Sequence, residues 1–410
     1  MNQIKQGYKQ TKVGIIPENW EVVNFDELKD KTDRHSITGG PFGSDLKSEH
    51  YTSSGVRVIQ LQNIGDGKYI NKEFVYTSEE KANQLKNCLI YPNEIILAKM
   101  AEPVARACLI PSFEDKFLMC SDGIRLLVDK NKFSTKYVLE YINYDLFRKI
   151  AINRSTGSTR GRIGLTDLKT IPLALPPLKE QEKIAEILTI WDEAITKQTE
   201  LLRAKELQKK ALMQKLLSGE VRFDGFSDKW EEVRLGEIGN SFNGLSGKTG
   251  EDFGIGEAKY ITYKNIFNYS KIKLDIFENV QISNDEKQNL VQFGDIFFTV
   301  SSETPEEVGM SSVLLDNVSN TYLNSFCFGY RLNNFNTLDP YFARFYFRSF
   351  QMRDKISRLA QGSTRFNLSK NEIMKLKIKL PSLPEQQKIA EVLSLADDEI
   401  NLLKNELEEL

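Results

Sequence analysis

The chain has 410 residues, 40% hydrophobic and 27% charged, with a formal net charge of −2. This is the composition of an ordinary globular protein with room for two or three domains. The net charge excludes a polycation, so a nucleic acid could be bound only by local basic surfaces.

The first twelve residues lack the apolar core of a signal peptide, and no run of 18 apolar residues predicts a membrane span. The four cysteines form no CxxC pair, and two histidines are too few for a His-based metal site. We therefore expect a cytoplasmic protein with reduced thiols, no metal, no cofactor and no membrane contact.

Short strands followed by helices are predicted for the first part of the chain. After Trp20 comes a Gly-rich stretch, and then come β-like runs at 56–61, 94–98 and 123–128. Aromatic residues at helical spacing predict a helix over 135–152. A GSTR loop, an apolar run and a proline break lead into a long helix from about Lys179 to Leu217, which Ser218-Gly219 ends.

The chain then repeats itself. GSTRGRIGLTDLKTIPLALPPLKEQEKIAEIL begins at Gly157 and GSTRFNLSKNEIMKLKIKLPSLPEQQKIAEVL at Gly362, an offset of 362 − 157 = 205. Three looser pairs keep the same order: WEVVNFDELKD with WEEVRLGEIGN, VIQLQNI with YITYKNI, and YPNEIIL with QFGDIFF. The sequence is therefore two copies of one unit, and the second copy predicts strands at 259–263, 295–300 and 328–332 and a helix over 340–359.

The two long helices carry the pattern of a coiled coil. The second begins near Leu383, where Ser382-x-x-Glu385 has the form of a capping box. Its apolar residues alternate at spacings of four and three: Ile389, Leu393, Ala396, Ile400, Leu403, Leu407 and Leu410. The same register in the first helix gives Ile184, Leu188, Trp191, Ile195, Gln198, Leu202, Lys205, Lys209, Leu212 and Leu216. Two surface helices on separate domains remain the alternative.

These sequences resemble the DNA specificity subunits of type I restriction–modification systems. The resemblance rests on the doubled segment from GSTR through LPPLKEQEKIAEIL and LPSLPEQQKIAEVL, on QKKALMQKLLSGEVRF, and on the openings GIIPENWEVV and FSDKWEEVRLGEI. It implies an α+β fold in which two tandem mixed α/β target recognition domains are joined by two long antiparallel coiled-coil helices. The implied domains are 1–177, a first spacer helix 178–218, a second domain 219–382 and a second spacer helix 383–410.

The resemblance also implies the function and the partners. Each recognition domain would read one half of a bipartite site on double-stranded DNA. The helices would set the spacing and dock two adenine methyltransferase subunits, which restriction (translocase–nuclease) subunits join, while the chain itself would catalyse nothing. Because the family's second helix normally closes with a segment like 208–223, the helix that stops at Leu410 is expected to be truncated.

Residues that both copies share cannot by themselves tell two different half-sites apart. We therefore expect the shared loops to contact the phosphate backbone, which hydroxyl groups and arginines bind without reading sequence. These candidates are Ser158, Thr159, Arg160, Arg162, Ser363, Thr364 and Arg365. The alternative is a tight loop that fixes the corner between a helix and a strand.

Sequence reading is expected where the copies diverge, in Gly-rich segments and in amide and basic side chains that match the edges of bases in the major groove. In the first copy the candidates are Gly40, Phe42, Ser44, Lys47, Arg57, Gln60, Gln62 and Asn63. In the second they are Asn243, Ser246, Lys248, Thr262, Tyr263, Lys264 and Asn265. A plain surface role stays open for each of them, and Trp20 and Trp230 are expected to anchor the core.

Partner docking is expected at the opening of the first long helix. Antiparallel seams pair Ile389 with Leu212 and Ile400 with Leu202, which leaves the first turns without a partner from this chain. A methyltransferase helix or a second copy of the chain, through self-association, would cover them. The docking candidates are Ile184, Ile187, Leu188 and Trp191.

Two other classes of protein are weighed against this interpretation. A fused methyltransferase–nuclease would need the Asn/Asp-Pro-Pro-aromatic signature, but Pro176 is preceded by Leu175, and no P-loop or GxGxxG follows a strand. A non-catalytic coiled-coil scaffold would leave the paired basic stretches 148–162 and 353–370 unexplained. Salt-sensitive DNA binding would distinguish the scaffold from a DNA-binding subunit.

Overall fold

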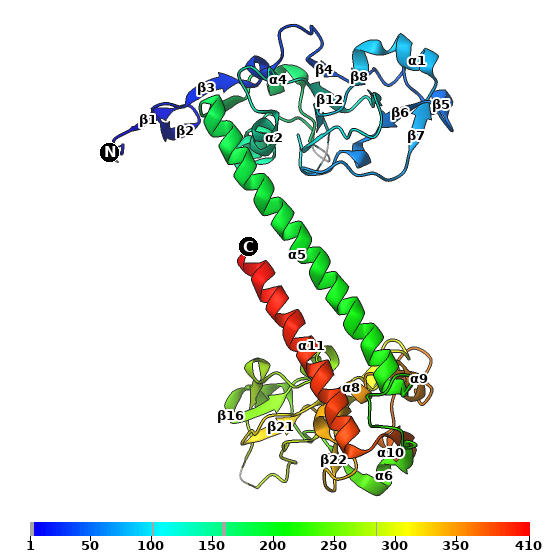
Figure 1. The fold of residues 1–410 in the computed structure, drawn as a ribbon. Coiled ribbons are helices and arrows are strands. Elements are labelled where there is room, and N and C mark those ends of the chain that lie inside the picture. The colour runs from blue at the N-terminus through cyan, green and yellow to red at the C-terminus, as the bar shows by residue number, and fades with distance from the viewer. Residues whose placement is uncertain (1–3, 101, 158–160, 284) are drawn as a thin grey trace. The chain divides into compact units, whose positions relative to one another are not determined.

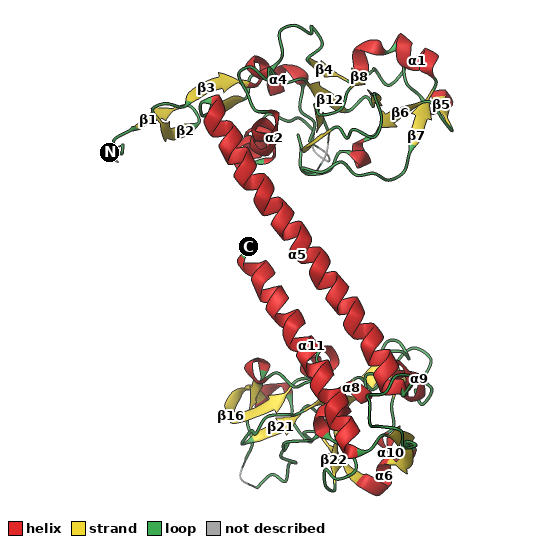
Figure 2. Ribbon diagram, viewed as in Figure 1, coloured by secondary structure: helices red, strands yellow, loops and turns green. Residues whose placement is uncertain are grey.

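The computed structural model describes residues 4–100, 102–157, 161–283 and 285–410. The chain divides into two compact units, Met1–Ala194 and Ile195–Leu410 (Figure 1). Both units mix short strands with helices, as Figure 2 shows by colour. Each unit is described separately below.

The first unit is built on two small sheets. Its elements are β1 (Tyr8–Thr11), β2 (Gly14–Pro17), β3 (Glu21–Asn24), β4 (Ile37–Gly39), β5 (Tyr51–Thr52), β6 (Val56–Ile59), β7 (Val75–Thr77), α1 (Glu79–Gln84), β8 (Leu89–Ile90), β9 (Ile95–Ala98), β10 (Ala107–Leu109), β11 (Phe117–Met119), β12 (Gly123–Leu126), α2 (Thr135–Asn143), α3 (Asp145–Asn153), α4 (Leu165–Lys169), β13 (Pro172–Leu175) and the opening of α5 (Leu178–Ser218). One of them has the order β10-β9-β12-β4 and the other β5-β7-β6-β11-β8, while β1 pairs with β2 and β3 with β13 in two further two-stranded sheets. Strands β6, β9 and β12 are buried along their whole length; β9 is a continuous apolar run, whereas β6 and β12 each contain one buried arginine, Arg57 and Arg125.

The second unit repeats this plan. Its elements are the rest of α5, β14 (Glu231–Arg234), α6 (Leu235–Ile238), β15 (Gly239–Asn243), β16 (Phe253–Ile261), α7 (Tyr263–Asn268), β17 (Glu278–Val280), β18 (Ile296–Thr299), β19 (Ser301–Ser302), β20 (Ser311–Val313), β21 (Thr321–Leu323), β22 (Cys327–Leu332), α8 (Pro340–Tyr346), α9 (Phe350–Ser357), β23 (Phe366–Asn367), α10 (Lys370–Lys375), β24 (Lys377–Leu380) and α11 (Leu383–Glu409). The order β15-β22-β18-β20 matches β4-β12-β9-β10, and the parallel pair β16–β21 matches β6–β11. The predicted strands are confirmed in both copies.

Each helix predicted before the GSTR loops is in fact two helices. In the first unit α2 ends at Asn143 because Tyr144 takes an extended backbone, with a ψ of 143°, and α3 begins directly after it. In the second unit Ser349 interrupts the helix, and its side chain accepts a hydrogen bond from the Met352 amide at the start of α9. Neither break has a Gly or Pro to announce it.

The long helices agree with the predicted seam. Along α5 the positions of the predicted register from Gln198 to Leu216 are half-buried or buried, and along α11 Ile389, Leu393, Ile400 and Leu403 are buried. Lysine stems cover the middle of the α5 seam, where no apolar residue is available. The first turns of α11 and the last turns of α5 also enter the main core of the second unit (Figure 1).

Polar contacts between α5 and α11 fix their antiparallel direction within the second unit. Lys209 pairs with Asp397, Lys205 with Glu399 at 2.6 Å, and Gln198 donates to Glu406 at 2.7 Å, so the numbering rises on one helix as it falls on the other. The last two contacts bracket the predicted pairing of Leu202 with Ile400, so the antiparallel coiled coil is confirmed.

Each long helix has a glutamate in its first turn that binds a side chain from outside the helix and does not form a capping box. Glu385 is buried, and its two carboxylate oxygens accept hydrogen bonds of 2.8 and 2.6 Å from the Arg222 guanidinium. Ser382 makes no side-chain cap hydrogen bond, so the predicted capping box was wrong. At the equivalent place in the first unit, Glu180 accepts a 3.1 Å hydrogen bond from the Trp20 indole. Trp20 and Trp230 are half-buried, and Trp230 packs against the main core of the second unit.

Candidate functional site

The Gly-rich segment of the first unit has a structural glycine and an exposed tip. A Cβ on Gly40 would lie 1.7 Å from the Cys120 carbonyl oxygen, and the Gly40 amide donates to the Gly123 oxygen at 2.8 Å. Its counterpart Gly244 has the same constraint, 2.1 Å from the Asn324 oxygen. Gly40 is therefore required for the close approach of two chain segments, and its contact with DNA stays a prediction.

The tip beyond this glycine stays available. Phe42 is 83% exposed, and Ser44 and Lys47 are exposed beside it. An apolar side chain held this far out of the core is suited to contact with another molecule.

Arg57 is not a free base reader, contrary to the prediction. Only 5% of it is exposed, because its guanidinium lies over Phe74 at 3.9 Å and near Phe113 at 5.1 Å. It also donates to the Asn71 side chain at 2.7 Å. Desolvated cation–π contacts of this kind hold the arginine inside its own unit.

Asn63 and Asn265 are also structural, contrary to the prediction. Both are fully buried, at equivalent places in the two copies. Asn63 donates to the Lys72 oxygen at 2.7 Å, and Asn265 donates to the Lys273 oxygen at 2.8 Å. Each amide closes a local turn, so neither can reach a base.

Lys248 is also committed to its own unit, contrary to the prediction, while Thr262 caps a helix and its contact with DNA stays a prediction. The Lys248 side chain is almost completely buried and pairs with Glu286. This bond is the main cause that lowers the pKa of Glu286 to about 2. The Thr262 hydroxyl caps α7 by accepting from the Asn265 amide at 3.2 Å.

The remaining reading candidates keep polar groups at the surface. Gln62 is exposed, and its amide donates to the half-buried Gln60 at 3.0 Å; Lys264 is exposed on α7. The exposed Asn243 accepts from Lys370 at 2.8 Å. Hydrogen bonds between exposed side chains can be exchanged for bonds to a ligand at small cost.

The shared loops close in the same way in both units. Thr156 and Arg162 exchange two backbone hydrogen bonds of 2.9 Å, and Gln361 and Asn367 make the equivalent pair at 2.9 and 2.8 Å. Gly157 and Gly362 both have positive φ, of 111° and 128°. The described residues of both loops are therefore compatible with the alternative of a tight corner loop.

The side chains of the shared loops differ in their availability. Ser158, Thr159 and Arg160 lie outside the described residues. Arg162 pairs with Asp122 at 2.7 Å, whereas Ser363, Thr364 and Arg365 are exposed. Arg365 is therefore the clearest candidate for a phosphate contact in the described part of the chain.

The two basic stretches are mostly used inside their own units. Arg148 pairs with Asp66, and Arg358 pairs with Asp354 at 2.8 Å. Arg353 is buried against backbone oxygens, and this burial lowers its pKa to about 10. The basic surface that these stretches leave free is therefore smaller than their sequences predict.

Two hollows of the second unit bring the predicted segments together. The first, of 720 Å³, is lined by Tyr263, Phe267, Ser301, Ser302, Glu303, Glu307, Phe326, Thr364 and Arg365. The second, of 450 Å³, is lined by Asn243, Gly244, Leu245, Ser246, Val300, Ser325, Cys327, Phe328, Leu368, Ser369 and Lys370. The hollows are neighbours, because Val300 and Ser301 are consecutive and lie one in each lining. The shared loop and both diverging segments of this copy therefore meet on one surface.

Side chains that the sequence did not single out complete the first hollow. Tyr263 stacks on Phe267 with ring centres 5.9 Å apart, and its hydroxyl donates to the Ser301 oxygen at 2.7 Å. Glu303, Glu307 and Phe326 are exposed around it. For Glu307 the signal in the sequence was the longer loop of the second copy between β18 and β20.

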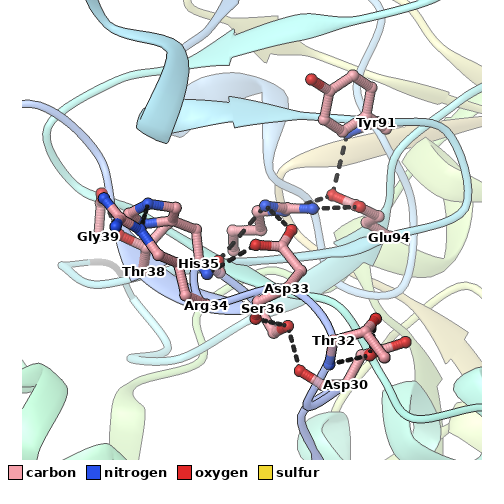
Figure 3. Close-up of polar contacts among 11 residues, drawn as sticks. Asp30, Thr32, Asp33, Arg34, His35, Ser36, Thr38, Gly39, Tyr91 and Glu94 are labelled. Atoms are coloured by element: carbon pink, nitrogen blue, oxygen red, sulfur yellow. Dashed lines mark hydrogen bonds and ion pairs between the residues drawn. The ribbon is translucent and has the colours of Figure 1, made fainter.

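Both units also contain a buried ion pair that sequence reasoning missed. Arg125 donates to both oxygens of Glu94 at 2.7 Å and pairs with Asp33 at 3.0 Å; Figure 3 shows Glu94 and Asp33 facing the same guanidinium. Arg331 holds Asp295 in the same bidentate way, also at 2.7 Å. Burial raises the pKa of Asp295, and the bond to Arg331 offsets part of that rise. The signal was present as Arg in GIRL and GYRL and as the acid in NEIIL and GDIFF.

The docking strip on α5 loses one predicted member. Ile184 packs against the core of the first unit, next to the buried Ala185, so it is not available for docking. Ile187, Leu188 and Trp191 are exposed, as is Ile190 between them. These four residues are called the α5 strip below.

In the ranges that the structure describes, no three His, Cys, Asp or Glu side chains are grouped to hold a metal ion. All four cysteines are free, and burial raises the pKa of Cys108 to about 12 and of Cys120 to about 11, so these two thiols are unreactive. Among the described helices, none combines the length and the apolar character needed to cross a bilayer.

Comparison with known proteins gives consistent matches over both halves. The family model of the type I restriction modification DNA specificity domain matches residues 17–204 and again 227–410. A putative type I restriction enzyme MjaX specificity subunit of Methanocaldococcus jannaschii is 26% identical, over 99% of this chain and 93% of the relative. The MjaIX specificity subunit of the same organism is 24% identical, over 75% of this chain and 72% of the relative.

Solved structures show the same fold. The HsdS subunit from Thermoanaerobacter tengcongensis matches with a TM-score of 0.51 at 16% identity, over 96% of this chain and 92% of that one. A type I system S subunit from M. genitalium matches with a TM-score of 0.54 at 18% identity, over 95% and 92%. A chain from a study of the assembly of the type I R-M system gives 0.58 at 17% identity, over 96% and 94%.

Proposed function

The chain belongs to the family of the type I restriction modification DNA specificity domain, and we propose on this premise that it reads a split DNA site. It is a type I restriction–modification specificity subunit with two tandem recognition domains, whose relatives are named as specificity subunits and not as catalytic ones. In this proposal the domains 1–177 and 219–382 each read one half of the site on double-stranded DNA.

The observation that carries this proposal is the surface of the second unit. There the exposed Arg365 of the shared loop lies beside Tyr263 of a diverging segment, in the lining of one hollow. A domain that reads one half-site needs phosphate contacts, which both copies can share, beside base contacts, which differ between the copies.

We propose further roles for the helices. As a continuous helix of 41 residues, α5 is about 60 Å long and would set the distance between the two DNA contacts. The α5 strip would dock an adenine methyltransferase subunit, and two such subunits with restriction subunits would form the complete complex. Similarity to a chain solved in a study of how a type I R-M complex assembles supports this proposal.

Replacing residues 1–177 with the equivalent domain of a related subunit is expected to change only one half of the methylated site. The physical reason is that the contacts of each recognition domain lie within its own unit. Sequencing of methylated adenines in a host that carries the complete system measures the result. The modular interpretation is wrong if both halves change together.

Arg365→Ala is expected to weaken binding to all DNA sequences alike, because a phosphate contact carries no base information. The slope of log K against log salt should become shallower by about 0.9, the value for one phosphate contact. Binding titrations at several salt concentrations, with specific and unrelated duplexes, measure both effects. The matched control is Arg358→Ala, since Arg358 is also exposed but is already paired with Asp354. Loss of preference at a single base would instead identify Arg365 as a base reader.

A further inference from the structure

The loop that follows β18 is longer than its counterpart in the first unit. The Thr299 amide bonds to the Met310 oxygen and the Ala98 amide to the Arg106 oxygen, so the two loops are 300–309 and 99–105. They hold 309 − 299 = 10 and 105 − 98 = 7 residues. The added residues place Glu306 and Glu307 in the second copy only, and so this loop is a point of divergence between the units.

Side chains of the same unit hold this long loop in place. Arg353 of α9 donates to three of its carbonyl oxygens, those of Glu306, Val308 and Gly309, the first at 2.7 Å and the last at 2.6 Å. A side chain on Gly309 would collide with Leu368 at 2.5 Å, so the loop also packs closely on its own unit. A guanidinium shared among backbone oxygens makes the loop rigid, and a rigid loop can place side chains accurately.

The side chains that this loop presents are acidic. Glu303 and Glu307 line the 720 Å³ hollow with Arg365, and Glu307 accepts a 3.1 Å hydrogen bond from the Ser302 hydroxyl. Carboxylates are repelled by phosphates, so in a DNA interface they are favourable only where they face a hydrogen-bond donor. In the major groove the donors are the amino groups of cytosine and adenine.

We propose that Glu307 determines the base preference of the second recognition domain, by accepting a hydrogen bond from an exocyclic amino group of its half-site. Arg365 holds the neighbouring phosphate, and Phe326, which is 62% exposed at the rim, contacts an adjacent base edge or thymine methyl group. Arg353 acts as a positioning residue through the loop. This inference rests on the proposed function and adds to it the residues and the chemistry of reading.

The test uses Glu307→Gln in the complete system. Glutamine keeps the shape but adds a donor, so preference should move from cytosine towards adenine at one position of one half-site. A change of roughly 10- to 100-fold in relative binding at that position is expected, with the other half-site unchanged. Sequencing of methylated adenines gives the site, and competition binding with single-base variants of the duplex gives the fold-change.

The matched control is Glu306→Gln. Glu306 is exposed in the same loop but does not line the hollow, so its replacement should leave the site unchanged. The inference is overturned if Glu307→Gln keeps the wild-type site, or if it weakens binding to all sequences equally. The proposed function survives that result as long as exchange of residues 1–177 still changes one half-site, and it fails if the exchange changes nothing.

Discussion

Arg125→Met is expected to lower the free energy of unfolding of the first unit by about 3–5 kcal/mol, because it leaves a buried carboxylate without its partner. The Glu94 side chain is 7% exposed and accepts two hydrogen bonds from Arg125. Its remaining hydrogen bond, from the Tyr91 amide at 3.1 Å, cannot replace them (Figure 3). Hydrogen exchange of peptides from β9 and β12 measures the loss locally, even when the second unit stays folded.

Two controls distinguish a broken buried pair from a general effect of lost charge. The double variant Arg125→Met with Glu94→Met should recover most of the stability, since a buried pair replaced by apolar side chains is often neutral. Lys116→Met removes a surface pair with Glu79 and should cost less than about 1 kcal/mol. Equal effects of Arg125→Met and Lys116→Met would contradict the structural role given to the buried pair.

Ile187→Glu with Trp191→Lys is expected to weaken binding of the methyltransferase subunit roughly 30- to 100-fold, since full burial of such a side chain is worth about 1.5–3 kcal/mol and these are already partly covered. The two side chains are 45% and 50% exposed on α5. The substituted pair has Glu four residues before Lys, an arrangement that supports the helix. Sedimentation of the chain with and without the purified methyltransferase subunit measures the result.

The control for the α5 strip is Leu207→Lys, which changes an exposed apolar residue on the same helix outside the strip. It should leave methyltransferase binding almost unchanged. Sedimentation of the chain alone shows whether the strip joins two copies instead. An unchanged affinity for the methyltransferase subunit in the variant with both strip substitutions would refute the docking proposal.

Much of the fold could be predicted because the sequence contains two copies of the same unit, with the same elements in the same order. The buried strands β6, β9 and β12 are rich in apolar residues, and their counterparts recur in the same order in the second copy. The seam of α5 and α11 followed from spacing alone, including positions where lysine stands in an apolar row. The breaks at Tyr144 and Ser349 could not be predicted, because tertiary packing and not local composition ends those helices.

The candidate site was harder to predict, because residue type does not reveal whether a polar side chain is free. Arg57 is held by aromatic rings 17 and 56 residues further along the chain, at Phe74 and Phe113, and no local pattern predicts that cage. For Asn63 and Asn265 the repeat did hold the signal. Both copies have the same asparagine, and a residue that both copies share cannot discriminate half-sites, so the repeat itself argued against a reading role for it.

The different partners of Glu180 and Glu385 make the two recognition domains unequal as exchangeable modules. Each glutamate opens a spacer helix, while its partner, Trp20 or Arg222, comes from the adjoining recognition domain. Shuffling of the first domain therefore severs one hydrogen bond from the Trp20 indole to the half-buried Glu180 carboxylate, which water can partly replace. Shuffling of the second severs an ion pair and strands a buried carboxylate, unless the incoming domain brings a cation to the same place. Recombination between related genes should accordingly be tolerated more widely at the first junction than at the second.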